Sequence, residues 1–588
     1  MHLDHQLMSH REYYMTHVLV HIKEVSRRPM DQQSKRVPKQ KHDRVILQFD
    51  YDCFYAQVFE NKDPALKSKA LGVKQKNILA TCNYNARRFG VRKLMLISEA
   101  KKLCKDLVLV DGEDLTPFRD TSKILFNFLR SYSWNNKAER LGFDEVFMDV
   151  TDIVDYNIEC LNIYCLYDSF FYLSRKDPED GFKCDFTTIA GCVEGTVPDE
   201  APLNNKTYLR LLLGSHLANH LRGKVEADYG YTSTCGISTN KLLSKLVGSR
   251  NKPRNQTTLM ALHDEDIFAF MDSHRTRQIP GLGFKASLQI ESHVLGEEAD
   301  TAPRSFTTAV SARDVRLHPS MSPGFIERLL AGPGAEKGIG IRIWSLLHGI
   351  DPTEVKEAGD IPTQISIEDT YKGLETIPQI TEELNKLSCS LIRRMRIDLL
   401  AQDQHAEKSG TQRWIARPKT VRLAIRSWPT RQGNSPTSDF SRITRSGPLP
   451  SFVFDLSADI DALAQKLVVE ALLPLLRRLQ TDRGQKGNLQ LINICVANMV
   501  AGAGDDKQGS GRDISAMFKR QDEVLRPFKL QHAYDGQRGA VVLSTGDLED
   551  LEPDTDWNDG DNSVCRDCGH SLPAFAMPAH LRYHEMGE

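Results

Sequence analysis

One hydrophobic segment with acidic residues at its end constrains the fold of this chain more than any other feature. Residues 45–49 form an almost continuous apolar run, followed directly by Asp50 and then by Asp52. Such a run predicts a buried strand. The two-residue period of a strand predicts that Asp50 and Asp52 share one face.

A second acidic pair, Asp144 and Glu145, follows Gly142 and precedes the apolar residues 146–150. This pattern predicts a turn between two strands, with both carboxylates at the junction. Crowded carboxylates are costly unless a cation neutralises them, and their hard oxygen atoms suit Mg²⁺ or Mn²⁺. The two acidic segments together predict a site for a pair of divalent ions, although a turn cap explains either pair alone better.

Basic residues gather between the two acidic segments. Residues 81–95 hold Tyr84, Arg87, Arg88, Arg92 and Lys93. A short helix there places Tyr84 and Arg87 on one face, and cations at this density can bind a triphosphate. An ordinary solvated face is the alternative.

The three segments together resemble the Y-family of translesion DNA polymerases, most closely its iota branch. The resembling motifs are FDYDCFYAQV at 49–58, TCNYNARRFGVRKLM at 81–95, LVLVDGEDLT at 107–116, LGFDE at 141–145, NKLLSKLV at 240–247 and IPGLG at 279–283. The resemblance implies an α+β multidomain fold shaped like a right hand. It also implies a DNA-directed DNA polymerase of low fidelity, which inserts deoxynucleotides opposite damaged template bases by two-metal-ion phosphoryl transfer in DNA repair.

The resemblance also assigns domains. They are a flexible N-terminal arm at 1–43, a palm at 44–53 and 113–256, fingers at 54–112, a thumb at 257–361, a little finger at 362–500, a largely disordered linker at 501–559 and a ββα-type zinc finger at 560–588. Within the palm, residues 155–206 have little periodicity, which predicts a surface insertion.

Site residues follow from the same resemblance. The catalytic carboxylates are Asp50, Asp144 and Glu145, with the backbone carbonyl of Tyr51 as a further ligand of the two Mg²⁺ or Mn²⁺ ions. Asp52 is not among them. Tyr84, Arg87 and Lys252 match positions that bind the β- and γ-phosphates of the nucleotide, and Lys245 is a weaker match.

Two further matches concern substrate selection. Tyr55 matches the steric gate, an aromatic ring that excludes a ribose 2′-hydroxyl, and a core aromatic is the alternative for this residue. Gln75, Lys76 and Ile78 fall where the fingers of the iota branch press on the templating base.

DNA contacts are expected at two places. Gly281 and Gly283 have the spacing of a helix-hairpin-helix turn, where backbone N–H groups reach a phosphate. In the little finger, strand alternation places basic residues on the face opposite Val421, and this strip is either a phosphate track or an ordinary exposed face. Its members are Arg422, Arg426, Arg442 and Arg445.

The C-terminal segment holds a separate metal-binding pattern. Two thiols and two imidazoles have the spacing of a tetrahedral Zn²⁺ site. The ligands are Cys565, Cys568, His580 and His584. The surrounding residues resemble the ubiquitin-binding zinc finger of the eta branch, but Arg582 stands where that finger carries an acidic residue that faces ubiquitin.

Partners and location are predicted from weaker signals. Residues 512–521 have the hydrophobic spacing of a degenerate sliding-clamp motif, and a plain amphipathic helix is the alternative. Primer-template DNA, deoxynucleoside triphosphates, a sliding clamp and ubiquitin or a ubiquitinated clamp are therefore the candidate partners. The net charge of −2 excludes a globally basic surface, so a DNA-binding face must be local.

The basic stretch at 35–44, the scattered 12 cysteines and the lack of a signal-peptide pattern or long apolar run predict a nuclear protein with no membrane partner. A non-catalytic scaffold that binds DNA and recruits repair partners through the zinc finger is the alternative function.

Overall fold

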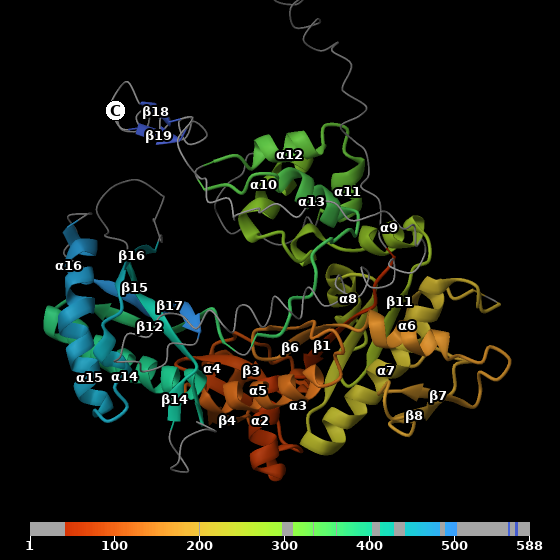
Figure 1. Cartoon of the computed structure of the whole chain (residues 1–588), viewed down its shortest axis with the longest axis horizontal. Coiled ribbons are helices and arrows are strands. Elements are labelled where there is room, and N and C mark those ends of the chain that lie inside the picture. The colour runs from red at the N-terminus through yellow and green to blue at the C-terminus, as the bar shows by residue number, and fades with distance from the viewer. Residues whose placement is uncertain are drawn as a thin grey trace, which may run out of the picture. The chain divides into compact units, whose positions relative to one another are not determined.

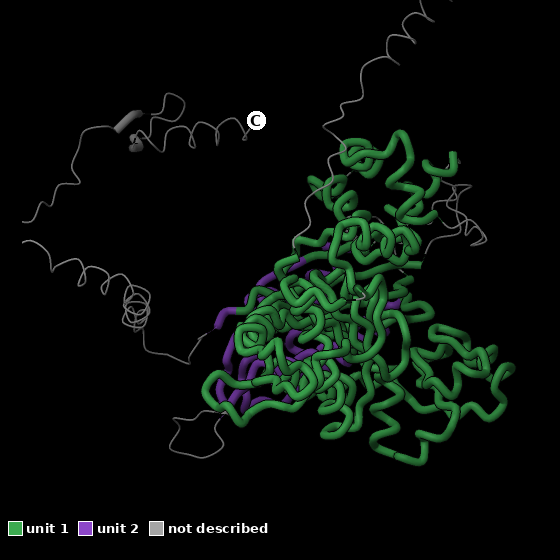
Figure 2. Tube along the Cα trace, turned by 90° about the vertical axis from the view of Figure 1, so that its right-hand side faces the viewer, with its two compact units in different colours: residues 1–375, 422–445, 485–499 green, residues 376–421, 446–484, 500–588 purple. Residues whose placement is uncertain are grey.

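The computed structural model describes residues 42–198, 200–296, 310–332, 334–359, 361–402, 412–428, 442–481, 488–501, 562–564 and 571–573. These residues divide into two compact units (Figure 2). Unit 1 lies within 1–375, 422–445 and 485–499, and unit 2 within 376–421, 446–484 and 500–588. Helices and strands occur in both, so the chain is a mixed α/β multidomain protein as predicted.

Unit 1 contains a six-stranded sheet in the order β5-β6-β1-β10-β11-β9. Three of its strands, β6, β1 and β11, are labelled in Figure 1. Its strands are β1 (Ile46–Tyr51), β5 (Ala138–Leu141), β6 (Glu145–Asp149), β9 (Cys192–Gly195), β10 (Ser233–Ser238) and β11 (Gln256–Met260). β1 is antiparallel to both β6 and β10, so it is paired along both edges. Residues 45–49 are all buried, which confirms the predicted buried strand.

Two helices, α7 (Lys206–Tyr229) and α8 (Lys241–Gly248), cover opposite faces of this sheet. Successive residues of a strand point to opposite faces. At Gly236 of β10, an added Cβ would lie 1.9 Å from the carbonyl oxygen of Ser244 in α8. At the neighbouring residue Ile237, the side chain faces α7, where a Cβ on Gly214 would lie 3.6 Å from Ile237 Cγ2. Helix α8 therefore rests on the backbone of β10.

A smaller sheet, in the order β3-β2-β4, follows β1 in the sequence and has its own core around Leu79 and Val91. Its strands are β2 (Leu71–Gln75), β3 (Ile78–Cys82) and β4 (Val108–Asp111). The helices of this region are α2 (Phe54–Lys62), η2 (Pro64–Leu66), α3 (Tyr84–Arg88), α4 (Ile97–Leu103) and α5 (Thr116–Arg130).

The prediction of a surface insertion at 155–206 is wrong for its last part. After α6 (Thr151–Glu159), a hairpin of β7 (Ser169–Tyr172) and β8 (Gly181–Cys184) is followed by β9, which pairs in parallel with β11 in the central sheet. Phe171 and Phe186 are buried in the main core of unit 1. This segment therefore completes the edge of the sheet.

A second hydrophobic core of unit 1 joins α8 to a helical region. Its helices are α9 (Asp264–Asp272), η3 (Thr276–Gln278), α10 (Phe284–Leu295), α11 (Ala312–Leu317), α12 (Pro323–Leu329) and α13 (Ile339–Leu347). The predicted hairpin turn lies between η3 and α10, where Gly281 has a φ of 93°. Among the described helices, none is long and apolar enough to span a membrane.

The last part of unit 1 contains β12 (Gln364–Leu374), which is antiparallel to β17 (Leu489–Ala501). They belong to a four-stranded sheet in the order β12-β17-β15-β16, with β15 (Ala416–Ser427) and β16 (Ile443–Pro448).

Unit 2 is mainly helical, with a short hairpin. Its other elements are α14 (Ile377–Leu399), β13 (Leu400–Gln402), β14 (Gln412–Trp414), η4 (Ser451–Phe454), α15 (Ile460–Leu467), η5 (Val468–Leu472) and α16 (Leu473–Thr481). Trp414 packs edge-on against Phe454 and donates a hydrogen bond to its carbonyl. Near the C-terminus, β18 (Asn562–Val564) pairs with β19 (Ser571–Pro573).

Candidate active site

Strand pairing brings the two acidic segments together. In the antiparallel register of β1 and β6, Asp50 lies opposite Glu145, and the N–H of Tyr51 donates a hydrogen bond to the carbonyl of Asp144 at 2.9 Å. Gly142, with a φ of 71°, makes the turn from β5 into β6. The turn and the register together place Asp50, Asp144 and Glu145 at one end of neighbouring strands.

The three carboxylates are crowded and partly neutralised by lysines. Burial raises the pKa of Asp144 to about 6, and the charges of Asp50 and Glu145 contribute to this rise. Lys252 Nζ lies 2.5 Å from an oxygen of Asp50, and Lys245 Nζ lies 2.5 Å from an oxygen of Glu145. The carboxylates of Asp50 and Glu145 are therefore each paired with a lysine ammonium group.

The chemistry of these donors fits divalent ions, since all are hard oxygen atoms. Across the part of the chain that the structure describes, however, no three His, Cys, Asp or Glu side chains are arranged as a ready cation site. Lys245 and Lys252 each pair with one oxygen of a carboxylate that would serve as a metal ligand.

The side chain of Asp52 has a structural role and accepts hydrogen bonds from neighbouring segments. Strand β1 ends at Tyr51, so the alternation that predicted a shared face does not extend to Asp52. The Asp52 carboxylate is buried and accepts hydrogen bonds from the hydroxyls of Thr232 and Thr234, at 3.0 Å each, and from the N–H of Arg254 at 2.9 Å. It thus anchors the loop that carries Lys252.

Tyr84 and Arg87 meet as predicted on the short helix α3. Asn83 caps this helix by accepting a hydrogen bond from the N–H of Ala86 at 3.0 Å. The guanidinium of Arg87 lies 4.5 Å from the ring centroid of Tyr84 and donates a hydrogen bond to the carbonyl of Cys82. Burial, with the charge of Asp52, raises the pKa of Tyr84 to about 12.

The ring of Tyr55, on α2, stacks on Phe118 at the start of α5. Burial, followed by the charge of Asp144, raises the pKa of the Tyr55 hydroxyl. Sequence reasoning did not identify Phe118, because an aromatic residue at the start of a helix carries no signal for the ring on which it will pack.

One cavity of about 1040 Å³ collects most of the predicted site residues in its wall. They are Asp50, Tyr51, Tyr55, Gln75, Tyr84, Arg87, Asp144, Glu145 and Lys252, together with Asp52, Arg92 and Lys93. Gln75 is fixed by a hydrogen bond from its side-chain amide to the carbonyl of Gly112 at 2.8 Å. Lys76 instead pairs with Asp369 at 2.6 Å, and Ile78 is half-buried in a bridge to Leu96.

The predicted DNA-binding residues lie outside this cavity. Gly281 and Gly283 are in the turn before α10. Arg422 and Arg426 are half-buried on β15, and Arg445 is exposed. Arg442 is engaged by two hydrogen bonds, at 2.8 Å each, to the carboxylate of Glu368.

The predicted zinc ligands Cys565, Cys568, His580 and His584 lie outside the described residues. So do Arg582 and the segment 512–521.

The sequence of this chain is also similar to those of known proteins. Residues 49–249 match the impB/mucB/samB family, and residues 362–511 match its C-terminal domain. DNA polymerase iota of Homo sapiens is 31% identical over 460 residues, which cover 78% of this chain and 52% of that protein. The chain thus spans about half the length of this relative.

Two further relatives match a shorter range. DNA polymerase iota of Drosophila melanogaster is 40% identical over 244 residues, which cover 42% of this chain and 30% of that protein. DNA polymerase eta of Drosophila melanogaster is 30% identical over 275 residues, again covering 42% and 30%. Because the two family models together match more than half of the residues, the chain belongs to the impB/mucB/samB family, the Y-family of DNA polymerases.

Proposed function

We propose that this protein is a DNA-directed DNA polymerase of low fidelity that inserts deoxynucleotides opposite damaged template bases. The observation that carries the proposal is one cavity of about 1040 Å³, whose wall holds the carboxylates of Asp50, Asp144 and Glu145, a group of cations and the ring of Tyr55. A nucleotidyl transfer site needs these three elements, namely metal ligands, triphosphate ligands and a surface that recognises the sugar.

Asp50, Asp144 and Glu145, with the carbonyl of Tyr51, would hold two Mg²⁺ or Mn²⁺ ions. When bound, such ions supply Lewis acidity at the attacking and leaving oxygens. The wall residues contribute the rest. Strand pairing between β1 and β6 fixes the carboxylates relative to each other, and this preorganisation reduces the cost of bringing them together around a charge.

Tyr84, Arg87 and Lys252 are the proposed ligands of the β- and γ-phosphates. A guanidinium and an ammonium offer charge-assisted hydrogen bonds to phosphate oxygens, and the stacking of Arg87 on Tyr84 limits the freedom of both side chains. Tyr55 would exclude a 2′-hydroxyl, and Gln75 would face the nascent base pair.

DNA outside the cavity would be held by backbone N–H groups at Gly281 and Gly283 and by the arginines of β15 and β16. Arg422, Arg426 and Arg445 are further candidates. Arg442 would first have to leave Glu368. Phosphate contacts of this kind supply affinity and carry no sequence information.

The proposed domain names follow the sequence assignment. The palm is 44–53 and 113–256, the fingers 54–112, the thumb 257–361, the little finger 362–500, and 501–559 is a linker. Residues 560–588 are proposed to bind one Zn²⁺. A sliding clamp and ubiquitin are proposed partners, and the nucleus is the proposed location, which suits a protein whose relatives are named DNA polymerases.

Primer extension with Mg²⁺ or Mn²⁺ tests the proposal. Replacing Asp144 and Glu145 together by Ala should abolish extension and leave primer-template binding nearly unchanged, since phosphate contacts elsewhere supply the affinity. The exposed pair Asp177 and Glu179, between β7 and β8, provides the matched control, and its double Ala variant should extend normally. Extension by the Asp144 and Glu145 variant at the wild-type rate would refute the assignment.

The alternative of a non-catalytic scaffold is not favoured. A scaffold does not need crowded, buried carboxylates, which cost stability in the metal-free protein.

A further inference from the structure

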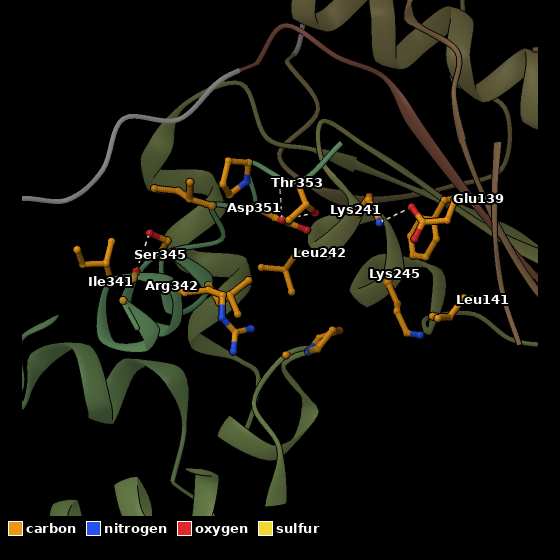
Figure 3. Close-up of a pocket in the computed structure, with 17 residues that line it drawn as sticks. Glu139, Leu141, Lys241, Leu242, Lys245, Ile341, Arg342, Ser345, Asp351 and Thr353 are labelled. Carbon is orange, nitrogen blue, oxygen red and sulfur yellow. Dashed lines mark hydrogen bonds and ion pairs between the residues drawn. The ribbon is translucent and has the colours of Figure 1, made fainter. Parts of the chain in front are cut away.

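A second cavity, of about 620 Å³, is lined by residues from several elements of unit 1 (Figure 3). It lies between the strands β5 and β6 with helix α8 on one side, and the Gly281 turn with helix α13 on the other. Lys245 of α8 lies in its wall, and the partner of Lys245, Glu145, lies in the wall of the larger cavity. The ion pair thus joins the walls of two adjacent cavities.

Three cations line this second cavity, and each has an acidic partner. Lys241 pairs with Glu139 at 2.6 Å, Arg342 with Glu336 at 3.0 Å, and Lys245 with Glu145 at 2.5 Å. Only Glu145 is a proposed metal ligand. Among the three cations of this lining, Lys245 is therefore the one whose acidic partner would become a ligand of a bound metal ion.

The remaining lining is mostly apolar and comes from both sides. It includes Leu141, Leu242, Pro280, Ile341 and Leu346. An ammonium released from Glu145 into such surroundings needs another anion, because an unpaired charge in a partly apolar site is costly. The apolar walls can also pack against a deoxyribose ring.

We propose that Lys245 exchanges Glu145 for a phosphodiester of the primer strand when a divalent ion binds, and that the 620 Å³ cavity receives this phosphodiester. The inference rests on the proposed function. The proposed triphosphate ligands lie in the wall of the larger cavity. The end of the DNA primer must also reach the carboxylates, and the adjoining cavity offers the space for it. Lys252 makes the same kind of pair with Asp50, but its proposed phosphate belongs to the nucleotide.

This exchange predicts that metal and primer help each other to bind, because two ligands that relieve the same ion pair are thermodynamically coupled. The test measures primer-template affinity by fluorescence anisotropy, with and without Ca²⁺ as a non-reactive ion. The Ca²⁺-dependent gain in affinity should be about fivefold smaller in Lys245→Met than in the wild type, as expected for one ion pair. In Ca²⁺, the slope of log affinity against log salt should also fall by about one in this variant.

Lys241→Met is the matched control. Lys241 lies one turn earlier on α8 and is also ion-paired, but its partner is Glu139. This variant should keep the full Ca²⁺-dependent gain. Lys245→Arg, which retains a cation, should keep most of the gain, so a loss confined to Lys245→Met cannot be a folding defect.

Direct metal binding gives the second measurement. Mn²⁺ binding to the DNA-free full chain, followed by electron paramagnetic resonance, should be about fivefold tighter in Lys245→Met, because the competing ammonium is gone. A merely structural role for Lys245 would weaken Mn²⁺ binding or leave it unchanged.

An equal Ca²⁺-dependent gain in Lys245→Met and Lys241→Met would overturn the proposal, as would unchanged or weaker Mn²⁺ binding. Either result leaves the proposed polymerase activity standing, since that activity is tested by primer extension with the Asp144 and Glu145 variant.

Discussion

The rings of Tyr55 and Phe118 are stacked almost parallel, with centroids 4.0 Å apart and an angle of 8° between their planes. Phe118 is completely buried, whereas Tyr55 is half-buried and lines the cavity. Stacking of this kind adds about 0.5–1.5 kcal/mol beyond the buried area. The ring of Tyr55, the proposed steric gate, is therefore held in position by its stacking on Phe118.

Weakening this support should relax sugar discrimination. Phe118→Leu keeps an apolar side chain but removes the flat face against Tyr55, so we expect the ring to move and ribonucleotides to be used more readily. The ratio of kcat/KM for dCTP to that for CTP should fall, and it should fall further in Tyr55→Ala. Phe128→Leu, which alters another aromatic residue of α5, is the control. If the ratio is unchanged in Tyr55→Ala, the gate lies elsewhere.

The raised pKa of Asp144 predicts a pH-dependent cost to folding. Because its pKa in the folded protein is about 6 against an ordinary 3.8, the folded protein binds the proton more tightly than the unfolded chain. The stability contributed by this proton is complete below pH 3.8 and is lost as the pH rises through 6. Asp144→Asn removes the charge, so it should stabilise the metal-free protein at pH 8 by up to about 3 kcal/mol.

Thermal unfolding in EDTA measures this effect. The gain in Tm of Asp144→Asn over the wild type should be large at pH 8 and should shrink at pH 5, where Asp144 is mostly protonated. Equal gains at the two pH values would contradict the assigned cause. The same variant should be inactive in primer extension, so stability and activity should change in opposite directions.

Removing Asp52 should destabilise the protein and loosen the nucleotide site. In Asp52→Ala, the buried hydroxyl of Thr234 loses its acceptor, and so do the partly buried hydroxyl of Thr232 and N–H of Arg254, which together should cost about 3 kcal/mol. Since Lys252 is in the same loop, the KM for dNTP should also rise. Asp106→Ala, at an exposed position, should change neither quantity. A normal Tm for Asp52→Ala would show that the network contributes little.

The C-terminal segment should bind zinc and yet bind ubiquitin weakly. The full chain should contain one Zn²⁺, and Cys565→Ser should lose it, because a tetrahedral site needs all four ligands. Arg582 puts a cation where the resembling finger has an acidic acceptor, and a missing charge-assisted hydrogen bond costs about 1.5–3 kcal/mol. Arg582→Asp should therefore bind ubiquitin about tenfold more tightly in a calorimetric titration. Tight binding by the unaltered chain would contradict this expectation.

The structural features that could be predicted from the sequence are those that depend on residues close together in the chain. Residues 45–49 predict a buried strand because they are apolar throughout, and Tyr84 and Arg87 predict a shared helical face from their spacing alone. β9 could not be predicted, since four residues without alternation become a strand only through pairing with β11. The ion pair between Lys245 and Glu145 was equally hidden, because it depends on how α8 lies across the sheet.

The close contact between α8 and β10 has a consequence for the charges of the site. Because Gly236 has no side chain, the helix that carries Lys241 and Lys245 lies directly on the backbone of the strand, with no room for even a methyl group. Any larger residue at this position would lift the helix and draw both ammonium groups away from their carboxylates. The distances between opposite charges at the site are thus controlled in part by a residue that carries neither a charge nor a side chain.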